Sequence, residues 1–358
     1  MNRTLYHRYR AVAFSGGLAL VLFASCSKSK SEGEENPKVT ETTDVAAKTD
    51  PKAEPVKADA EAEAKKAADV KKVAEAIAKL ETDVAAERER WTEELAASAK
   101  TLATAEYGTA KEALAALAAS SHRKPTNIAR DGDRHPAETL EFFGLKPDSS
   151  VVEMGIGGGW YTEFILPMVA NKGQYVGGAY DAEGPKDSML SVYGMRQVAF
   201  LGMNEDLYGK AKTFDLGAEK LVIGEPESAD LVVAMREMHN WQRRGSMDDK
   251  LKAVIAVLKP GGSFGVVQHR AKADGKAEET AEQGYLPEAW VIEKVEAAGL
   301  RFVEKSEINA NEKDTKDYPD GVWTLPPSFR QGDTDREKYA AIGESDRMTL
   351  RFEKPKAE

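Results

Sequence analysis

Residues 151–160 constrain the fold of this chain more than any other stretch. They begin as a β-branched apolar run that ends on Glu153, continue through Gly155, Gly157 and Gly159, and lead into a helical pattern. This order predicts a buried strand, a tight turn and the start of a helix. The glycines allow positive φ angles and leave no Cβ atoms in the path of a ligand. We therefore expect a ligand over the carboxyl end of this strand, as in other open α/β sheets.

The glycine spacing excludes two common phosphate-binding motifs. A dinucleotide fingerprint with Gly155 and Gly157 as its first glycines needs a third at position 160, which is Trp160. A phosphate-binding loop needs Lys-Ser or Lys-Thr after the turn, and neither follows. What remains, an acid and then Gly-x-Gly-x-Gly after a strand, resembles the first motif of the class I S-adenosylmethionine-dependent methyltransferases. The alternative is a glycine turn that only eases the packing of strand on helix.

A second acid follows about one strand-helix-strand unit later. The apolar run at residues 174–181 closes on Asp181, where a carboxylate can accept hydrogen bonds from both hydroxyl groups of a ribose. Alternatively, Asp181 only caps the loop that follows it. The resemblance implies S-adenosylmethionine as cofactor, bound by Glu153, Gly155, Gly157, Gly158, Gly159, Asp181 and Arg236.

Strand and helix patterns alternate through the rest of the chain. We expect further strands at residues 174–181, 211–216, 230–235, 263–270, 301–308 and 347–353. We expect helices at residues 137–145, 160–171, 186–210, 251–258 and 287–299. This order is typical of α/β proteins with a parallel sheet.

Residues 258–262, Leu-Lys-Pro-Gly-Gly before a strand, also resemble class I methyltransferases. The resemblance implies an α/β, Rossmann-like fold with a mostly parallel seven-stranded sheet and helices on both faces. In this fold the last strand is antiparallel beside the sixth. Residues 121–358 would form the domain, with an insertion at about 309–345 on the carboxyl edge of the sheet.

The resemblance extends beyond these two motifs. From about residue 123 to the end, the chain resembles a group of bacterial exported proteins described only as predicted methyltransferases. This resemblance implies a fold and a cofactor, but it supplies no methyl acceptor. The segments that carry it are residues 239–241, 268–270, 284–288 and 321–327.

The amino terminus has the pattern of an export signal. Residues 1–25 combine a basic start with an apolar run that is too short to span a membrane. Cys26, the only cysteine, follows small residues and resembles a bacterial lipobox, although Phe23 stands where Leu is usual. The resemblance implies cleavage before Cys26, lipidation there and anchoring to the cell envelope, with Ser27 favouring the periplasmic side of the outer membrane. An ordinary signal with an incidental cysteine is the alternative.

Two segments separate the signal from the domain. Residues 26–57 lack large apolar side chains and predict a disordered tether. Residues 58–120 are rich in Ala, Glu and Lys and predict a long helix. Its apolar seam, within residues 70–102, suits a partner helix or a short coiled coil, although a solvated spacer fits equally well. The seam comprises Val73, Ile77, Leu80, Val84, Trp91, Leu95 and Leu102.

The charge balance argues against nucleic acid as a partner. The chain carries a net charge of −10, and removal of the signal makes it more acidic. No basic patch with interleaved aromatic residues is present in the sequence. We expect a small-molecule acceptor and a lipid anchor as partners.

Candidate catalytic residues follow the fourth and fifth expected strands. His239, Asn240 and His269 lie where the methyl group of the cofactor should point. A histidine can remove a proton from the acceptor near neutral pH, and His239 is favoured because polar and aromatic residues surround it. Each histidine could instead be structural. We expect no metal site, because no metal-ligand spacing is present.

A charged segment precedes the first strand. Arg130, Asp131, Arg134 and His135 could close over a ligand, or could pair among themselves and fix the segment to the core.

Two functions of different class remain open. The first is a methyltransferase. The second is a non-catalytic binding or scaffold lipoprotein that retains the fold, favoured by export away from the cytoplasm, where S-adenosylmethionine is made. A nicotinamide-dependent oxidoreductase is a distant third.

Overall fold

The computed structural model describes residues 53–356 of the 358. The residues from Val56 onward form one unit, which contains all the elements discussed below except the first residues of helix α1 (Ala53–Arg90). The predicted signal at residues 1–25, the predicted lipidation site Cys26 and most of the predicted tether at 26–57 lie outside the described residues. Among the described helices, none combines the length and the apolar character needed to cross a membrane.

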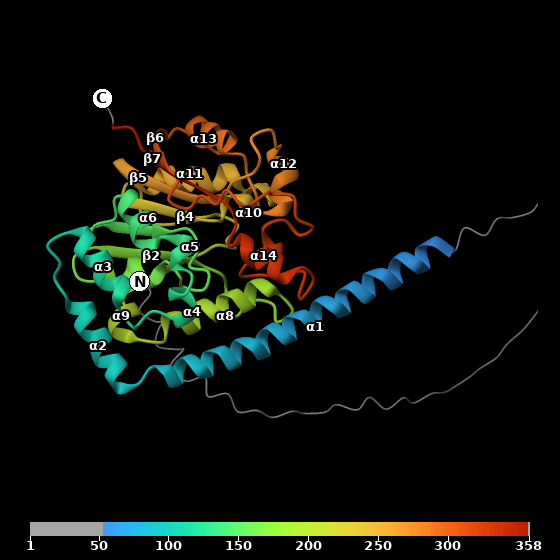
Figure 1. Cartoon of the computed structure of the whole chain (residues 1–358), viewed down its shortest axis with the longest axis horizontal. Helices are drawn as coiled ribbons and strands as arrows, with labels where there is room; N and C mark the ends of the chain where they lie inside the picture. Colours follow the sequence, from blue (N-terminus) through green and yellow to red (C-terminus); the bar gives the residue numbers. More distant parts are fainter. Residues whose placement is uncertain (1–52, 357–358) are drawn as a thin grey trace, which may run out of the picture. The chain divides into compact units, whose positions relative to one another are not determined.

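A seven-stranded sheet forms the centre of the domain (Figure 1). Its strand order is β3-β2-β1-β4-β5-β7-β6, and β7 is antiparallel to both of its neighbours, whereas β1 to β5 pair in parallel. The α/β class and the mostly parallel sheet are therefore confirmed, including the antiparallel last strand beside the sixth. The strands are β1 (Ser150–Glu153), β2 (Gln174–Ala179), β3 (Lys212–Asp215), β4 (Ala229–Met235), β5 (Leu258–His269), β6 (Arg301–Ser306) and β7 (Arg347–Glu353).

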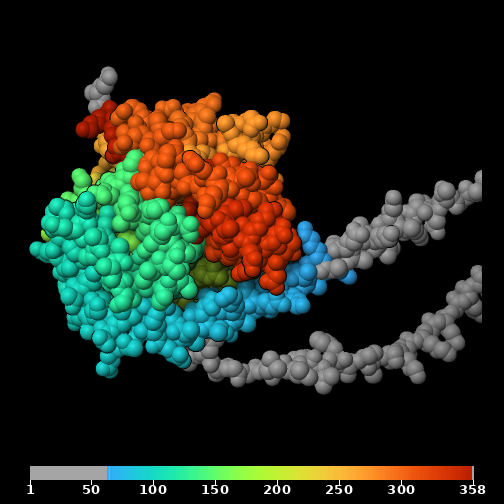
Figure 2. Space-filling model, in the orientation of Figure 1, coloured from blue at the N-terminus to red at the C-terminus, as the bar shows by residue number. Residues whose placement is uncertain are grey.

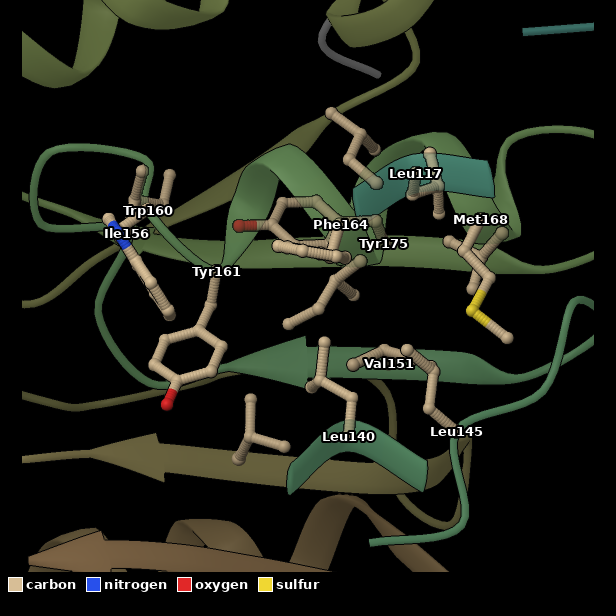
Figure 3. Close-up of a cluster of buried hydrophobic side chains, with 14 of the residues drawn as sticks. Leu117, Leu140, Leu145, Val151, Ile156, Trp160, Tyr161, Phe164, Met168 and Tyr175 are labelled. Atoms are coloured by element: carbon tan, nitrogen blue, oxygen red, sulfur yellow. The ribbon is translucent and has the colours of Figure 1, made fainter. Parts of the chain in front are cut away.

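Helices cover both faces of this sheet. On one face, apolar residues of the sheet pack with α2 (Glu93–Thr104), α3 (Ala110–Ala119), α6 (Pro136–Phe142), α7 (Thr162–Val169) and α9 (Glu205–Tyr208). Figure 3 shows part of this core, with Leu140 of α6, Val151 of β1 and Phe164 of α7 around one interior. On the other face the core includes α10 (Met238–Arg243), α11 (Met247–Val257), α12 (Ala277–Thr280) and α13 (Glu288–Ala297). Burial on both faces explains why β4 is apolar along nearly its whole length.

The predicted long helix at residues 58–120 is interrupted. Helix α1 covers Ala53–Arg90, and a new helix starts after Thr92, whose side chain accepts a hydrogen bond from the amide of Leu95. A threonine hydroxyl in this position satisfies an amide that the first helical turn leaves free. Residues 186–210, which are helical in pattern, likewise form two helices. Here α8 (Met189–Leu201) ends at Gly202, and Asn204 caps α9.

The apolar seam of α1 packs within the chain. Val73 and Leu80 are buried and form a small cluster with Val192 of α8. The seam that suggested a partner helix is therefore covered, over this part of its length, by a helix of the same domain.

The predicted insertion leaves β6 and returns through β7 at the carboxyl edge of the sheet. It contains the short 3-10 helix η3 (Gly321–Thr324) and α14 (Arg336–Ile342). In Figure 2 the insertion, in red, lies beside the green segment that precedes β1. That segment holds the two short helices α4 (Pro125–Ile128) and α5 (Asp131–Arg134). A cavity of about 330 Å³ lies between α5 and the end of the insertion.

Candidate functional site

The glycine turn after β1 has two packed positions and two open ones. A Cβ atom on Gly155 would lie 3.3 Å from Oε1 of Glu237, and one on Gly159 would overlap the ring of Phe200. Gly157 and Gly158 are exposed, and a Cβ atom on either would meet no atom within 4 Å. A ligand could therefore approach Gly157 and Gly158 from the side where a Cβ atom would stand, whereas that side of Gly155 and Gly159 is filled by Glu237 and Phe200.

Asp181 follows the strand beside this turn. Strands β1 and β2 pair in parallel, and the amide of Ile156 donates to the carbonyl of Gly178 at 3.0 Å. The Asp181 side chain is exposed, and its Oδ1 accepts a hydrogen bond from the amide of Glu183 at 2.9 Å. Asp181 thus caps its own loop with one oxygen, and its Oδ2 hydrogen-bonds no described residue. The predicted contact with a ribose remains a prediction.

Glu153 lies inside the fold and has protein partners. Its Oε2 accepts hydrogen bonds from the hydroxyl groups of Thr162, at 2.8 Å, and Tyr175, at 2.6 Å. Burial raises the pKa of the carboxyl group to about 7, against the two hydroxyl donors, which lower it. These contacts join β1, β2 and α7, so Glu153 stabilises the base of the turn from within.

Two histidines lie close together after β4 and β5. The ring centroids of His239 and His269 are 5.8 Å apart, and the ring of Trp323, from η3, lies 6.0 Å from that of His239. Nδ1 of His269 lies 2.5 Å from the hydroxyl of Ser345. The structure therefore brings both predicted histidines together and adds Trp323 and Ser345 from the insertion. No group of three or more His, Cys, Asp or Glu side chains within residues 53–356 could hold a metal ion.

Gln268 determines the tautomer of His239. Its Nε2 donates to the carbonyl of Gly284 at 2.9 Å, so Oε1 faces Nδ1 of His239 at 3.3 Å. Because an amide oxygen only accepts, Nδ1 carries the proton and Nε2 is the basic nitrogen. Burial lowers the pKa of His239 to about 4 and that of His269 well below its ordinary value. Both rings are therefore neutral at pH 7.

Asn240 supports a buried carboxyl group that the sequence analysis missed. Its side chain lowers the pKa of Glu237, the residue that packs against Gly155, and its backbone amide donates a hydrogen bond to the Glu237 carbonyl at 2.9 Å. Burial raises the pKa of Glu237 to about 7, and the nearby Arg236 opposes this rise. Asn240 thus contacts the turn through Glu237, and its predicted catalytic role remains untested.

An arginine cluster borders the histidines. Glu344 forms ion pairs with Arg130 at 2.7 Å, Arg134 at 2.8 Å and Arg347 at 2.9 Å. Arg236 lies within electrostatic range of this group but makes no ion pair with a described carboxylate. We name Arg130, Arg134, Arg236, Arg347 and Glu344 the arginine cluster.

The expectation that the charged segment pairs internally is wrong. Arg130 and Arg134 pair with Glu344, and Asp131 pairs with Arg123, whose guanidinium binds it through two nitrogens at 2.6 and 2.7 Å. These partners lie up to 214 residues apart in the sequence, so no local pattern could have revealed them.

The chain is similar to several solved structures. It shares 16% identity with a SAM dependent methyltransferase from Aquifex aeolicus, over 68% of this chain and 97% of that one, with a TM-score of 0.41. It shares 18% identity with the [4+2]-cyclase SpnF, over 63% of this chain and 81% of that one, with a TM-score of 0.43. It shares 13% identity with the N-methyltransferase NodS from Bradyrhizobium japonicum, over 62% of this chain and 96% of that one, with a TM-score of 0.37. No protein-family model matches the chain, and no curated protein matches it significantly. The fold class itself follows from the strand order and directions described above.

Proposed function

We propose that this protein transfers a methyl group from S-adenosylmethionine to a small-molecule acceptor. The observation that carries the proposal is the open, exposed backbone of Gly157 and Gly158 beside the carboxylate of Asp181. Both lie at the carboxyl ends of neighbouring parallel strands, where open α/β sheets bind their ligands.

The residues at this edge fit a nucleoside. The backbone of Gly157 and Gly158 admits the close approach of the ligand, and Oδ2 of Asp181 can accept from ribose hydroxyl groups. When bound, S-adenosylmethionine would supply an electrophilic methyl group. Glu153 keeps the strand, the turn and the helix in register through Thr162 and Tyr175.

His239 and His269 would serve the acceptor. Nε2 of His239 carries no proton and hydrogen-bonds no described residue, so it can accept one from the acceptor. Trp323 and Ser345 lie beside the two rings and help to exclude water. Most of the rate enhancement would come from holding the acceptor in line with the methyl group.

A ligand titration tests the proposal. The full chain is titrated calorimetrically with S-adenosylmethionine and S-adenosylhomocysteine, with NADH as a third ligand. We expect Asp181→Ala to weaken binding at least about tenfold, because a charged acceptor of two hydrogen bonds is lost. Glu183→Ala is the matched control, since it removes a neighbouring charge but keeps the amide that binds Asp181.

Two results would contradict the enzyme. If neither adenosyl ligand gives a heat of binding at millimolar concentration, the non-catalytic scaffold protein is the remaining function. If only NADH binds, the oxidoreductase is favoured. Unchanged affinity in Asp181→Ala would remove this residue from the site.

Export and lipid anchoring form a separate proposal. The motif at residues 23–27 supports lipidation of Cys26 on the periplasmic side of the outer membrane. Bacteria that express the full chain with labelled palmitate should label the wild type and the Ser29→Ala control, but not Cys26→Ala. Equal labelling of Cys26→Ala would overturn the proposal.

A further inference from the structure

The arginine cluster carries more positive charge than the protein neutralises. Three guanidinium groups pair with one carboxylate, Glu344, whose two oxygens accept one N–H group from each of them. The fourth, of Arg236, lies within electrostatic range of Glu344 and forms no ion pair with a described residue. Glu153 and Glu237 are within electrostatic range of Arg236, but neither forms an ion pair with it, and burial raises the pKa of both to about 7. The cluster therefore keeps an excess of positive charge at neutral pH.

Several of its nitrogens lack partners. Nη1 of Arg236, Nη2 of Arg130 and Nε of Arg347 are buried and hydrogen-bond no other described residue. Nε and Nη2 of Arg236 hydrogen-bond no described residue either, although the side chain is only partly exposed. A buried, unsatisfied donor on a charged group is costly, so such a concentration at one place indicates a missing acceptor.

The backbone at Arg236 is also unusual. Its φ angle is 61°, in the left-handed region that residues with a Cβ atom rarely adopt. The conformation is held by a hydrogen bond from its amide to the carbonyl of Val267 at 2.6 Å. Backbone strain of this kind is concentrated at binding sites.

The strand order places Arg236 and Asp181 on opposite sides of β1. Strand β4, which ends just before Arg236, lies on one side of β1, and β2, which precedes Asp181, lies on the other. The charges of Arg236, Arg347 and Arg134 act on His269, which lies after β5. At its outer end the cluster borders the cavity of about 330 Å³, which Glu344 and Arg347 line.

We propose that the arginine cluster binds an acidic group of the methyl acceptor, so that the acceptor is an anionic small molecule bearing a carboxylate or a phosphate. Arg236 and Arg130 present planar guanidinium groups, which match the paired oxygens of such a group. The inference rests on the methyl-transfer function. The competing source of the same chemistry is the carboxylate of the cofactor's methionine part, which would give Arg236 the cofactor-binding role expected from the sequence, and the experiment separates the two.

The first arm measures anion binding by the full chain. Inorganic phosphate and acetate are titrated into wild type, Arg236→Gln and Arg301→Gln at constant ionic strength. Arg301 is the matched control, because it is an exposed arginine at the opposite end of the sheet, paired with Glu353. We expect Arg236→Gln to weaken phosphate binding at least about tenfold and Arg301→Gln to leave it unchanged. If Arg236→Gln does not fold, Arg130→Gln, whose native side chain is 25% exposed, takes its place.

The second arm identifies the source of the anion. S-adenosylhomocysteine carries the methionine carboxylate, whereas 5′-methylthioadenosine lacks it. We expect Arg236→Gln to bind both ligands within about twofold of the wild-type affinity. A selective loss of S-adenosylhomocysteine affinity would assign the cluster to the cofactor and overturn the proposal.

Two other results are decisive. The anion site is overturned if phosphate and acetate bind neither the wild type nor Arg236→Gln, or if they bind both proteins equally tightly. Either result leaves the methyl-transfer function intact. If neither the wild type nor any variant binds an adenosyl ligand, the methyl-transfer function is wrong. The assignment of the cluster to a methyl acceptor is then wrong as well, even if phosphate binding depends on Arg236.

Discussion

At the scale of single residues, Glu153 shows how a buried acid can stabilise the turn and also make stability depend on pH. Its pKa in the folded protein is about 7, above the ordinary value of 4.5, because burial disfavours the ionised form. The neutral carboxyl group therefore contributes stability that is fully present below pH 4.5. That contribution is lost as the pH rises through 7.

Tyr175→Phe tests this coupling. The hydroxyl of Tyr175 donates to Glu153 and lowers its pKa, so its removal should raise that pKa further. We expect a loss of about 1–2 kcal/mol in the free energy of unfolding, with a larger loss at pH 8 than at pH 5. Urea unfolding at the two pH values measures it. Tyr339→Phe is the control, because this buried tyrosine's hydroxyl hydrogen-bonds no described residue, and its effect should not change with pH. A loss in Tyr175→Phe that is equal at both pH values would refute the coupling.

The glycine turn offers a matched pair of substitutions. Gly159→Ala places a methyl group in the ring of Phe200 at a φ angle of 87°, so we expect a loss of about 2–4 kcal/mol in unfolding free energy. Gly158→Ala meets no atom within 4 Å and should change stability by less than about 0.5 kcal/mol. The same Gly158→Ala protein should lose S-adenosylhomocysteine affinity at least about tenfold if the ligand touches this backbone. Equal destabilisation by both substitutions would contradict the assignment of Gly158 to open space.

The sequence predicted part of this site. The glycines after an apolar run indicated a ligand-binding turn, because strand, turn and helix are adjacent in the chain. It could not indicate that Phe200 occupies the space at Gly159, or that Glu237 occupies the space at Gly155, since these contacts depend on tertiary packing. Glu344 and Arg347 were missed for the same reason.

At the scale of secondary structure, α1 is joined to the domain by a small apolar cluster and, at its end, by hydrogen bonds from Arg90 to the carbonyls of Ser121 and His122. Only Val73 and Leu80 of its seam are buried, against Val192 of α8. A helix held by so few apolar contacts should open locally at lower free energy than the sheet.

Hydrogen exchange with Leu80→Ala tests this local opening. We expect amides of α1 near residue 80 to exchange at least about tenfold faster, because truncating a buried leucine removes about 2 kcal/mol of local stability. Amides of β4 should keep their protection. Val70→Ala is the control, since Val70 is on the same helix but 46% exposed. If β4 amides accelerate as much as those of α1, the helix is part of the global folding unit.

Elements with strong patterns were predicted more accurately than their boundaries. The alternation in residues 347–353 matches β7, and the apolar run at 230–235 matches most of β4. Helix ends were less predictable, because α8 stops at Gly202 within a sequence that is still helical in pattern. Strand β5 begins at Leu258, five residues before the predicted start, and includes Pro260 and the glycines after it. Its pairing with β4 is irregular there, which accommodates a proline that cannot donate a hydrogen bond.

At the scale of the whole domain, Glu344 connects two segments that lie far apart in the sequence, the segment before β1 and the end of the insertion before β7. It joins Arg130 and Arg134, which precede β1 and lie 214 and 210 residues before it in the chain, to Arg347 at the start of β7. These ion pairs hold the insertion against the segment before the first strand, so both segments contribute residues to the arginine cluster.

Glu344→Gln should therefore destabilise the domain strongly. The change removes the described carboxylate that pairs with two buried guanidinium groups, of Arg134 and Arg347, and with the partly exposed Arg130. Breaking a buried pair of this kind costs about 3–5 kcal/mol. Arginines lower the Glu344 pKa to about 2, so the ionised group contributes stability above pH 4.5 that is lost as the pH falls towards 2. In urea unfolding, the difference between variant and wild type should be largest at pH 7 and smaller at pH 3. Glu353→Gln, which breaks the exposed pair with Arg301, should cost less than about 1 kcal/mol at either pH. A small loss in Glu344→Gln that does not depend on pH would show that the arginines are stabilised by water, and that Glu344 is not the group that holds the two segments together.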